Sequence, residues 1–179
     1  MNSGKNNEMN FLKKPIVLIG MMGCGKSAIG KALSTVLSCS FYDCDDLIVE
    51  DQGKPITQIF SDEGECAFRI LEQQKMQDLL GRGVCVISTG GGAITVADVM
   101  DDIKVRAISV WLQSDVETVL MRVGDDNGRP LLQCDNPRKK LEELLSARER
   151  LYALADIHID NTSGNIGDVV EMIIQELQT

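Results

Sequence analysis

The segment Gly20–Ser27 reads GMMGCGKS and matches the pattern G-x-x-x-x-G-K-[ST] at every defined position. It follows the apolar run Pro15–Ile19 and precedes a helical pattern from Ser27 to about Leu37, which is the strand, loop and helix context that this motif requires. Glycines allow a tight loop whose backbone N–H groups turn toward one centre, and the start of the helix adds its positive dipole end. The segment therefore predicts a site for the phosphates of a nucleoside triphosphate.

Two side chains of this loop have expected roles of their own. Lys26 can reach the β- and γ-phosphates, and the Ser27 hydroxyl can ligate Mg²⁺. The residues expected to contact the nucleotide within the loop are Met22, Gly23, Cys24, Gly25, Lys26 and Ser27.

The composition is that of a single globular domain. The chain has 179 residues, 44% apolar and 25% charged, which is enough for one full hydrophobic core. Its net charge of -9 disfavours a general nucleic-acid binder, and no apolar run is long enough for a membrane span or a signal sequence. Its six cysteines form no C-x-x-C pair, which argues against zinc and for a reducing compartment. We expect a cytoplasmic monomer without nucleic-acid or membrane partners, with a disordered leader at 1–13 and one domain at 14–179.

Strand-like runs alternate with helical patterns along the chain. The expected strands are 15–20, 41–44, 84–88, 107–112 and 157–160. The expected helices are 27–37, 45–50, 56–60, 65–80, 94–100, 115–123, 137–154 and 165–177. This alternation predicts a parallel sheet covered on both faces, with ligands at the carboxyl ends of the strands. The phosphate loop and the triple glycine Gly90–Gly92 both fall at that edge.

Asp43 and Asp45 flank Cys44 at the end of the second expected strand. If strand geometry continues through them, both side chains point the same way. One can then orient a water on Mg²⁺ while the other holds an acceptor hydroxyl and takes its proton. The alternative is that Asp45 caps the next helix and the other acid is solvated. Their place beside the phosphate loop favours the functional interpretation.

Several arginines could bind an acidic substrate, because a guanidinium fork matches a carboxylate. Arg69 has Glu72 three residues on, which by itself indicates a surface pair on a helix. Arg148 and Arg150 lie on the long helix near the end of the chain, and local spacing does not choose among these candidates. Arg129 lies in a loop rich in glycine and aspartate, which suggests a lid that closes on the phosphates.

Taken together, the motifs resemble the shikimate kinase family from about Ile16 to the end of the chain. The motifs are, in order, GMMGCGKSAIGKALS, DCDDLIVE, GECAFRILE, STGGGAI, and RPLL before SARERLY. The first is shared by many phosphate-loop kinases, whereas the combination of the others is specific. The resemblance implies an α/β P-loop NTPase fold of the nucleoside monophosphate kinase type, with a parallel five-stranded sheet of order 2-3-1-4-5 flanked by helices. It also implies a substrate-binding region at about 45–80 and a lid at about 124–136.

The same resemblance implies the reaction and the residues that carry it. ATP would donate its γ-phosphate to the 3-hydroxyl of shikimate, giving shikimate 3-phosphate and ADP in the chorismate and aromatic amino-acid pathway. The catalytic residues would be Lys26, Asp45 and Arg129. Shikimate would contact Asp45, Arg69, Gly90, Gly91, Gly92 and Arg148. Arg122 and Arg129 would join the loop in binding ATP, with Arg122 near adenine, and Ser27 would ligate Mg²⁺ with Asp43 behind a water.

The sequence departs from the family pattern in two places. SARERLY contains two arginines, of which position in the motif favours Arg148 over Arg150. The segment Asp160–Gly164 lacks the arginine that some members place beside adenine, so its contacts with adenine stay open.

Two other functions remain open at this point. One is another small-molecule kinase of the same fold, such as a gluconate kinase; paired arginines favour a carboxylated acceptor. The other is a non-catalytic shikimate kinase-like binding module, which the intact motif residues disfavour. A regulatory GTPase is disfavoured because the sequence has no N-K-x-D guanine-binding motif.

Overall fold

The computed structural model describes residues 12–123, 130–132, 134–162 and 165–179. The expected leader up to residue 11 and most of the expected lid, including Arg129, lie outside these ranges.

The described residues form one parallel sheet in the order β2-β3-β1-β4-β5. Its strands are β1 (Ile16–Ile19), β2 (Ser40–Asp43), β3 (Cys85–Ser88), β4 (Ile108–Gln113) and β5 (Ile157–Asp160). In the centre of the sheet, Ile16 of β1 pairs with Val86 on one side and with Ile108 on the other. The predicted fold class and the strand order 2-3-1-4-5 are therefore confirmed.

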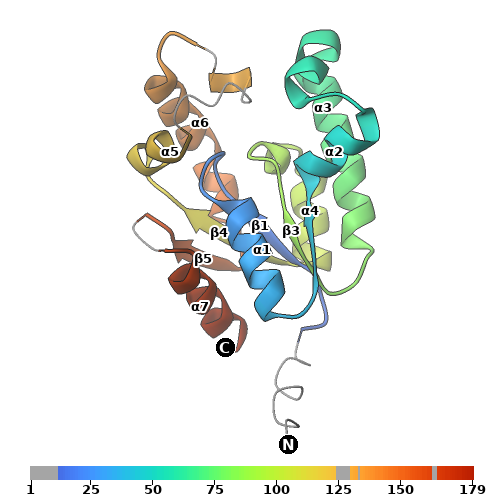
Figure 1. The fold of residues 1–179 in the computed structure, drawn as a ribbon, viewed down its shortest axis with the longest axis vertical. Helices are drawn as coiled ribbons and strands as arrows, with labels where there is room; N and C mark the ends of the chain where they lie inside the picture. Colours follow the sequence, from blue (N-terminus) through green and yellow to red (C-terminus); the bar gives the residue numbers. More distant parts are fainter. Residues whose placement is uncertain (1–11, 124–129, 133, 163–164) are drawn as a thin grey trace, which may run out of the picture.

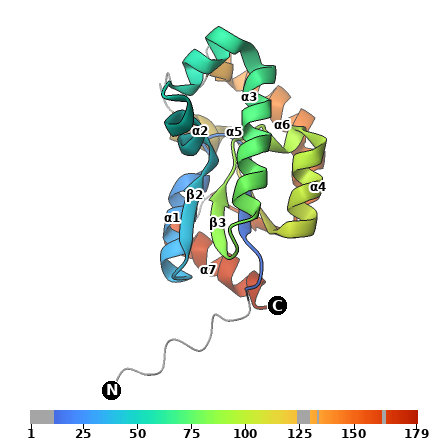
Figure 2. The ribbon, with the colours of Figure 1, turned by 90° about the vertical axis from the view of Figure 1, so that its right-hand side faces the viewer.

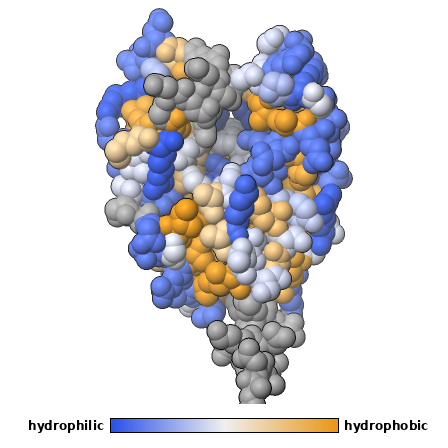
Figure 3. Space-filling model, viewed as in Figure 1, coloured by the Kyte–Doolittle hydropathy of each residue, from blue (hydrophilic) through white to orange (hydrophobic). Residues whose placement is uncertain are grey.

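Helices cover both faces of the sheet and rise above one edge (Figures 1 and 2). On one face lie α1 (Lys26–Val36) and α7 (Ile166–Leu177), and on the other α3 (Ile56–Leu80) and α4 (Ala97–Arg106). Beyond the carboxyl ends of the strands, α2 (Cys44–Gln52) stands beside α3, while α5 (Val116–Val123) and α6 (Pro137–Tyr152) form a second group. Figure 3 shows that the surface is hollowed between these two groups.

The sheet separates two apolar clusters because side chains alternate along each strand. One cluster lies between the sheet and α1 and α7, and it includes Ile16 and Leu18 of β1. The other lies on the opposite face, under α3, α4 and α6, and it includes Val17 and Ile19. Leu12 also packs in the α1 and α7 cluster, so the ordered core begins within the segment that the sequence assigns to a leader. Among the described helices, none is both long enough and apolar enough to cross a bilayer.

One expected helix differs from the structure, whereas a predicted break between two helices is confirmed. The expected helix 94–100 is instead a 3₁₀ turn, Ala93–Thr95, followed by α4, which continues to Arg106 because its buried stripe of Val99, Met100 and Ile103 extends past residue 100. The expected helices 56–60 and 65–80 are the two parts of α3, which is interrupted at Gly64, where φ is 83° and ψ is 172°, so the predicted break is confirmed. Glycine has access to such a conformation, so the chain bends there without a second loop.

A glycine lets α1 lie close to the sheet, and this contact can be tested by substitution. A Cβ at Gly30 would lie 2.4 Å from the Phe41 ring. Although alanine is the better helix former, we predict that Gly30→Ala destabilises the fold by about 1–3 kcal/mol, because the core is overpacked. Denaturant unfolding measures the change.

The matched control is Gly81→Ala at the end of α3. There φ is -85° and an added Cβ meets nothing closer than 3.4 Å, so we expect stabilisation by about 0.4–1 kcal/mol. A Gly30→Ala protein as stable as the Gly81→Ala protein would contradict the close packing of α1.

Candidate active site

The loop between β1 and α1 has the backbone that a phosphate site requires. Gly23 and Gly25 have φ values of 76° and 95°, a region that side chains with a Cβ rarely occupy. A Cβ at Gly23 would also lie 2.5 Å from the Val123 side chain. The loop therefore needs glycine for its conformation and for its contact with α5.

This loop forms one wall of a cavity of about 340 Å³ at the carboxyl edge of the sheet. The cavity is lined by Met22, Gly23, Gly25, Lys26, Ser27, Ala28, Asp43, Asp45, Ser88, Thr89, Gly91 and Arg122. Cys24 is expected to contact the nucleotide but is fully buried and is absent from this lining. Cys24 therefore contributes to the site through its backbone and through its Sγ, which accepts a long hydrogen bond from Lys26 Nζ at 3.8 Å.

The Lys26 ammonium is held at the loop itself. Its Nζ donates hydrogen bonds to the carbonyl oxygens of Gly20 at 2.9 Å and Met21 at 2.8 Å. The side chain is buried, so these bonds satisfy a charge that would otherwise be costly to desolvate. They also place a positive charge in the wall of the cavity, where phosphate oxygens would carry negative charge.

Asp43 joins the loop to the second strand. The Ser27 hydroxyl donates to Asp43 Oδ2 at 2.5 Å, and Asp43 Oδ1 accepts from the Asp45 backbone N–H at 3.1 Å. Asp43 is thus the N-cap of α2, and the prediction that Asp45 caps this helix is wrong. The reason is that α2 begins at Cys44, so strand geometry ends at Asp43.

The Ser27 hydroxyl oxygen and the Asp43 carboxylate, which bond to each other, also suit a magnesium ion. Mg²⁺ prefers oxygen ligands and is usually held by one or two protein groups together with phosphate oxygens and water. Within the described ranges there is no group of three or more His, Cys, Asp or Glu residues that could hold a metal alone. The Ser27 hydroxyl and the Asp43 carboxylate therefore fit a metal that arrives with a nucleotide.

A second, smaller cavity of about 90 Å³ adjoins the first. Its lining combines aromatic and aliphatic side chains with charged ones, namely Met22, Asp45, Ile56, Phe60, Phe68, Arg69, Glu72, Gly90, Gly91, Gly92 and Leu131. Met22, Asp45 and Gly91 line both cavities. A group bound in the second cavity would therefore meet the phosphate cavity at Asp45 and Gly91.

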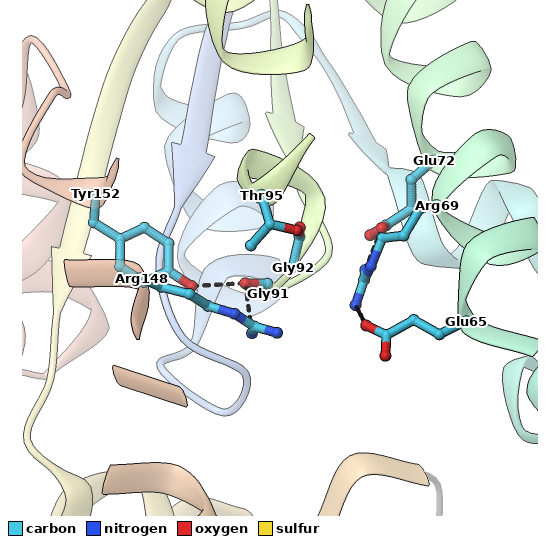
Figure 4. A network of polar contacts seen from close by, with 8 residues as sticks. All are labelled: Glu65, Arg69, Glu72, Gly91, Gly92, Thr95, Arg148 and Tyr152. Carbon is cyan, nitrogen blue, oxygen red and sulfur yellow. Dashed lines mark hydrogen bonds and ion pairs between the residues drawn. The ribbon is translucent and has the colours of Figure 1, made fainter. Parts of the chain in front are cut away.

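Arg69 is the positively charged side chain in the lining of the second cavity, beside the carboxyl groups of Asp45 and Glu72. It makes ion pairs with Glu72 and with Glu65, the latter at 2.7 Å, and Figure 4 shows it facing the glycine turn. Glu72 is fully buried, so the expected surface pair is in fact largely enclosed. A Cβ at Gly92 would lie 2.4 Å from the Arg69 guanidinium, which explains why the turn has glycine at this position.

Two carboxylate oxygens in this region have no partner. Asp45 Oδ1 and Glu72 Oε1 are buried and have no hydrogen-bond partner among the described residues, and both lie beside Gly90. Burial, together with the negative charges of Glu72 and Asp43, raises the pKa of the Asp45 carboxyl to about 7. A carboxylate with such a pKa can exchange a proton near neutral pH, and unpaired buried acceptors suit a ligand that carries hydroxyl groups.

Helix α6 holds the other side of the glycine turn (Figure 4). Arg148 and the Tyr152 hydroxyl both donate to the Gly91 carbonyl, at 3.1 and 2.6 Å. Arg148 is buried, whereas Arg150 is exposed, so of these two arginines Arg148 is the one that contacts the glycine turn, although it is not among the residues that line the two cavities. Arg69 and Arg148 thus flank the glycine turn from opposite sides.

Sequence reasoning assigned no function to three residues that the structure brings to the site. Glu72 and Tyr152 lie within the GECAFRILE and SARERLY motifs, which could have drawn attention to them. Asn161 had no such signal, yet it bonds to the phosphate loop. Arg122, expected near adenine, donates to the backbone carbonyls of Cys24 at 3.2 Å and Asn161 at 3.0 Å.

A phosphate loop serving one cavity, with a second cavity directly beside it, is the arrangement of a phosphate-loop kinase that acts on a small molecule. Residues 22–178 match the family model described as shikimate kinase. The chain belongs to the shikimate kinase family.

Relatives and solved structures agree with this assignment. A curated shikimate kinase from Cereibacter sphaeroides is 39% identical over 171 residues, which cover 96% of this chain and 86% of the relative. A structure described as shikimate kinase from Acinetobacter baumannii in complex with shikimate has a TM-score of 0.90 at 39% identity, covering 92% of this chain and 93% of that one. A gluconokinase from Sinorhizobium meliloti has a TM-score of 0.59 at 16% identity, covering 92% of this chain and 91% of that one, and shares the fold alone.

The two acidic partners of Arg69 differ in burial, which leads to a stability prediction. We expect Glu72→Gln to cost about 1.5–3 kcal/mol of unfolding free energy, because it removes a buried charged hydrogen bond from Arg69, which keeps its ion pair with Glu65. Glu65 is 47% exposed, so Glu65→Gln should cost at most about 1 kcal/mol. Thermal and denaturant melts measure both, and equal losses would contradict the buried pair.

Proposed function

We propose that this chain is a shikimate kinase, which transfers the γ-phosphate of ATP to the 3-hydroxyl of shikimate in the chorismate and aromatic amino-acid pathway. The observation that carries the proposal is the junction of the two cavities at Asp45 and Gly91. A carboxylated ring with hydroxyl groups in the smaller cavity would present one hydroxyl to the phosphate cavity. The products would be shikimate 3-phosphate and ADP.

The smaller cavity has matching groups for each part of shikimate. Arg69, which lines this cavity, would hold the carboxylate, and Arg148, which lies on the other side of the turn Gly90–Gly92 and is not among the lining residues, would be its second partner. Phe60 and Phe68 offer an apolar wall to the ring. The unpartnered oxygens of Asp45 and Glu72 would accept hydrogen bonds from its hydroxyls.

The larger cavity would bind the phosphates of ATP through the loop N–H groups and Lys26. When bound, Mg²⁺ would neutralise charge on the phosphates, with Ser27 as ligand and Asp43 behind a water. Arg122 would lie near the nucleotide, and Arg129 in the lid would close over the phosphates.

Asp45 would orient the 3-hydroxyl toward the γ-phosphorus and accept its proton during transfer. Closure of the lid would exclude water, which otherwise competes with the hydroxyl for the phosphoryl group. We expect the enzyme to work as a cytoplasmic monomer, with shikimate and ATP as partners and with neither nucleic acid nor membrane.

The acceptor is tested by ADP production in a coupled assay with shikimate, with gluconate and with no acceptor. Turnover should require shikimate, because a rigid ring can place its apolar face on Phe60 and Phe68 while its carboxylate meets Arg69 and its hydroxyls meet Asp45 and Glu72. Gluconate, although carboxylated, is a flexible open chain without such a face. A preference for gluconate would favour the other kinase of this fold. Binding of shikimate and ATP without ADP production would favour the non-catalytic module.

The role of Arg69 can be tested with a substitution that still gives Glu72 a positively charged neighbour. Arg69→Lys keeps the positive charge but loses the bidentate fork, so we predict that KM for shikimate rises about 10- to 100-fold, the value of a charged hydrogen bond. KM for ATP should change less than twofold. Steady-state kinetics measure both, with Arg82→Lys, at the far end of α3, as the matched control. A rise confined to KM for ATP would contradict the assignment.

A further inference from the structure

Asn161 is a buried polar residue, 2% exposed, that bonds directly to the phosphate loop. Its side-chain amide donates to the carbonyl oxygen of Cys24. Arg122 donates to the same carbonyl at 3.2 Å and to the Asn161 carbonyl at 3.0 Å. The loop, α5 and the end of β5 are thus joined by three hydrogen bonds around the Cys24 carbonyl.

The two donors to this carbonyl are not equivalent. Arg122 is an exposed residue on a long side chain, so it loses much conformational freedom when it is held in place. Asn161 is short and buried, and its backbone N–H donates to the Gln113 carbonyl at 2.8 Å. The sheet therefore fixes Asn161, and Asn161 is the more rigid support for the loop.

The orientation of one peptide group follows from this support. In a planar trans peptide the C=O and the N–H point in opposite directions, and the described residues contain no cis peptide bond. Holding the Cys24 carbonyl on the side of Asn161 turns the Gly25 N–H to the opposite side. Gly25 lines the phosphate cavity, where an N–H group can bind a phosphate oxygen.

We propose that Asn161 is a positioning residue for the nucleotide phosphates: by holding the Cys24 carbonyl, it presents the Gly25 N–H to the cavity. The inference rests on the phosphate-binding half of the proposed function. It also leaves Arg122 free to move to a bound nucleotide, because the carbonyl keeps its bond to Asn161. Asn161 itself does not touch the nucleotide, since its amide nitrogen is engaged and its side chain is enclosed.

The test compares binding of ADP, tripolyphosphate and shikimate by calorimetry in wild type and Asn161→Ala, without added metal. We expect ADP and tripolyphosphate to bind about 10-fold more weakly to the variant, the effect of weakening one hydrogen bond to a charged group. Shikimate should bind within twofold of wild type. Tripolyphosphate is the decisive probe, because it has phosphates but no nucleoside.

Asn165→Ala is the matched control, since Asn165 caps α7 by accepting from the Asp168 N–H at 3.0 Å and does not bond to the loop. It should lose about 1 kcal/mol of stability with unchanged binding of all three ligands. If Asn165→Ala weakened tripolyphosphate binding as much as Asn161→Ala, the effect would be a general structural one and the proposal would be overturned.

Other outcomes are equally clear. Unchanged tripolyphosphate binding in folded Asn161→Ala overturns the positioning role, and weakened ADP binding alone would mean that Asn161 acts on the nucleoside. If the variant does not fold, the Gly25 amide resonance of wild type provides the test. It should shift when tripolyphosphate is added, and a fixed resonance overturns the proposal. Failure of wild type to bind either ADP or tripolyphosphate would overturn the proposed function as well.

Discussion

Strand β1 is fully buried, with β3 and β4 on its two sides and helices on both faces. A parallel strand in this position has its backbone groups paired on both sides, so the chain can change direction only at the strand's ends. The phosphate loop leaves from the carboxyl end, beside the ends of β3 and β4. This constraint brings Gly20–Ser27, Asp43 and the turn Gly90–Gly92 to one edge although they are far apart in the sequence.

Segments approach one another closely at this edge because its glycines have no side chain. At Gly92 the missing side chain leaves room for the Arg69 guanidinium, and at Gly91 an added Cβ would lie 2.9 Å from the Met22 backbone N. The phosphate loop and the glycine turn therefore approach each other directly, and the two cavities share a boundary. Transfer between ligands bound on either side would need no large movement of these segments.

The local parts of this arrangement could be predicted from the sequence. Apolar runs, the phosphate-loop motif and the alternation of strands and helices define the sheet, because they depend on neighbouring residues. The motif favours Arg148 over Arg150, and Arg148 is the buried one of the two, but the arginine that binds the substrate stays a prediction. The mistaken N-cap at Asp45 came from a one-residue error in where β2 ends.

Long-range partners could not be predicted in this way. Glu72 pairs with Arg69 on its own helix, but its burial depends on packing that no local pattern shows. Tyr152 and Asn161 act on Gly91 and Cys24, which lie 61 and 137 residues away in the chain. Such hydrogen bonds depend on the assembled sheet, and a single sequence carries little sign of them.

The central claim is that the phosphoryl group passes directly from one ligand to another bound in the adjoining cavity. Phosphorus NMR of a reaction with ATP and shikimate tests this claim most directly, because it resolves ester phosphate from inorganic phosphate. The account predicts one phosphate ester at the 3-hydroxyl for each ADP formed, with inorganic phosphate at the level of a reaction without enzyme. ADP accompanied by an equal amount of inorganic phosphate, and no ester, would contradict it.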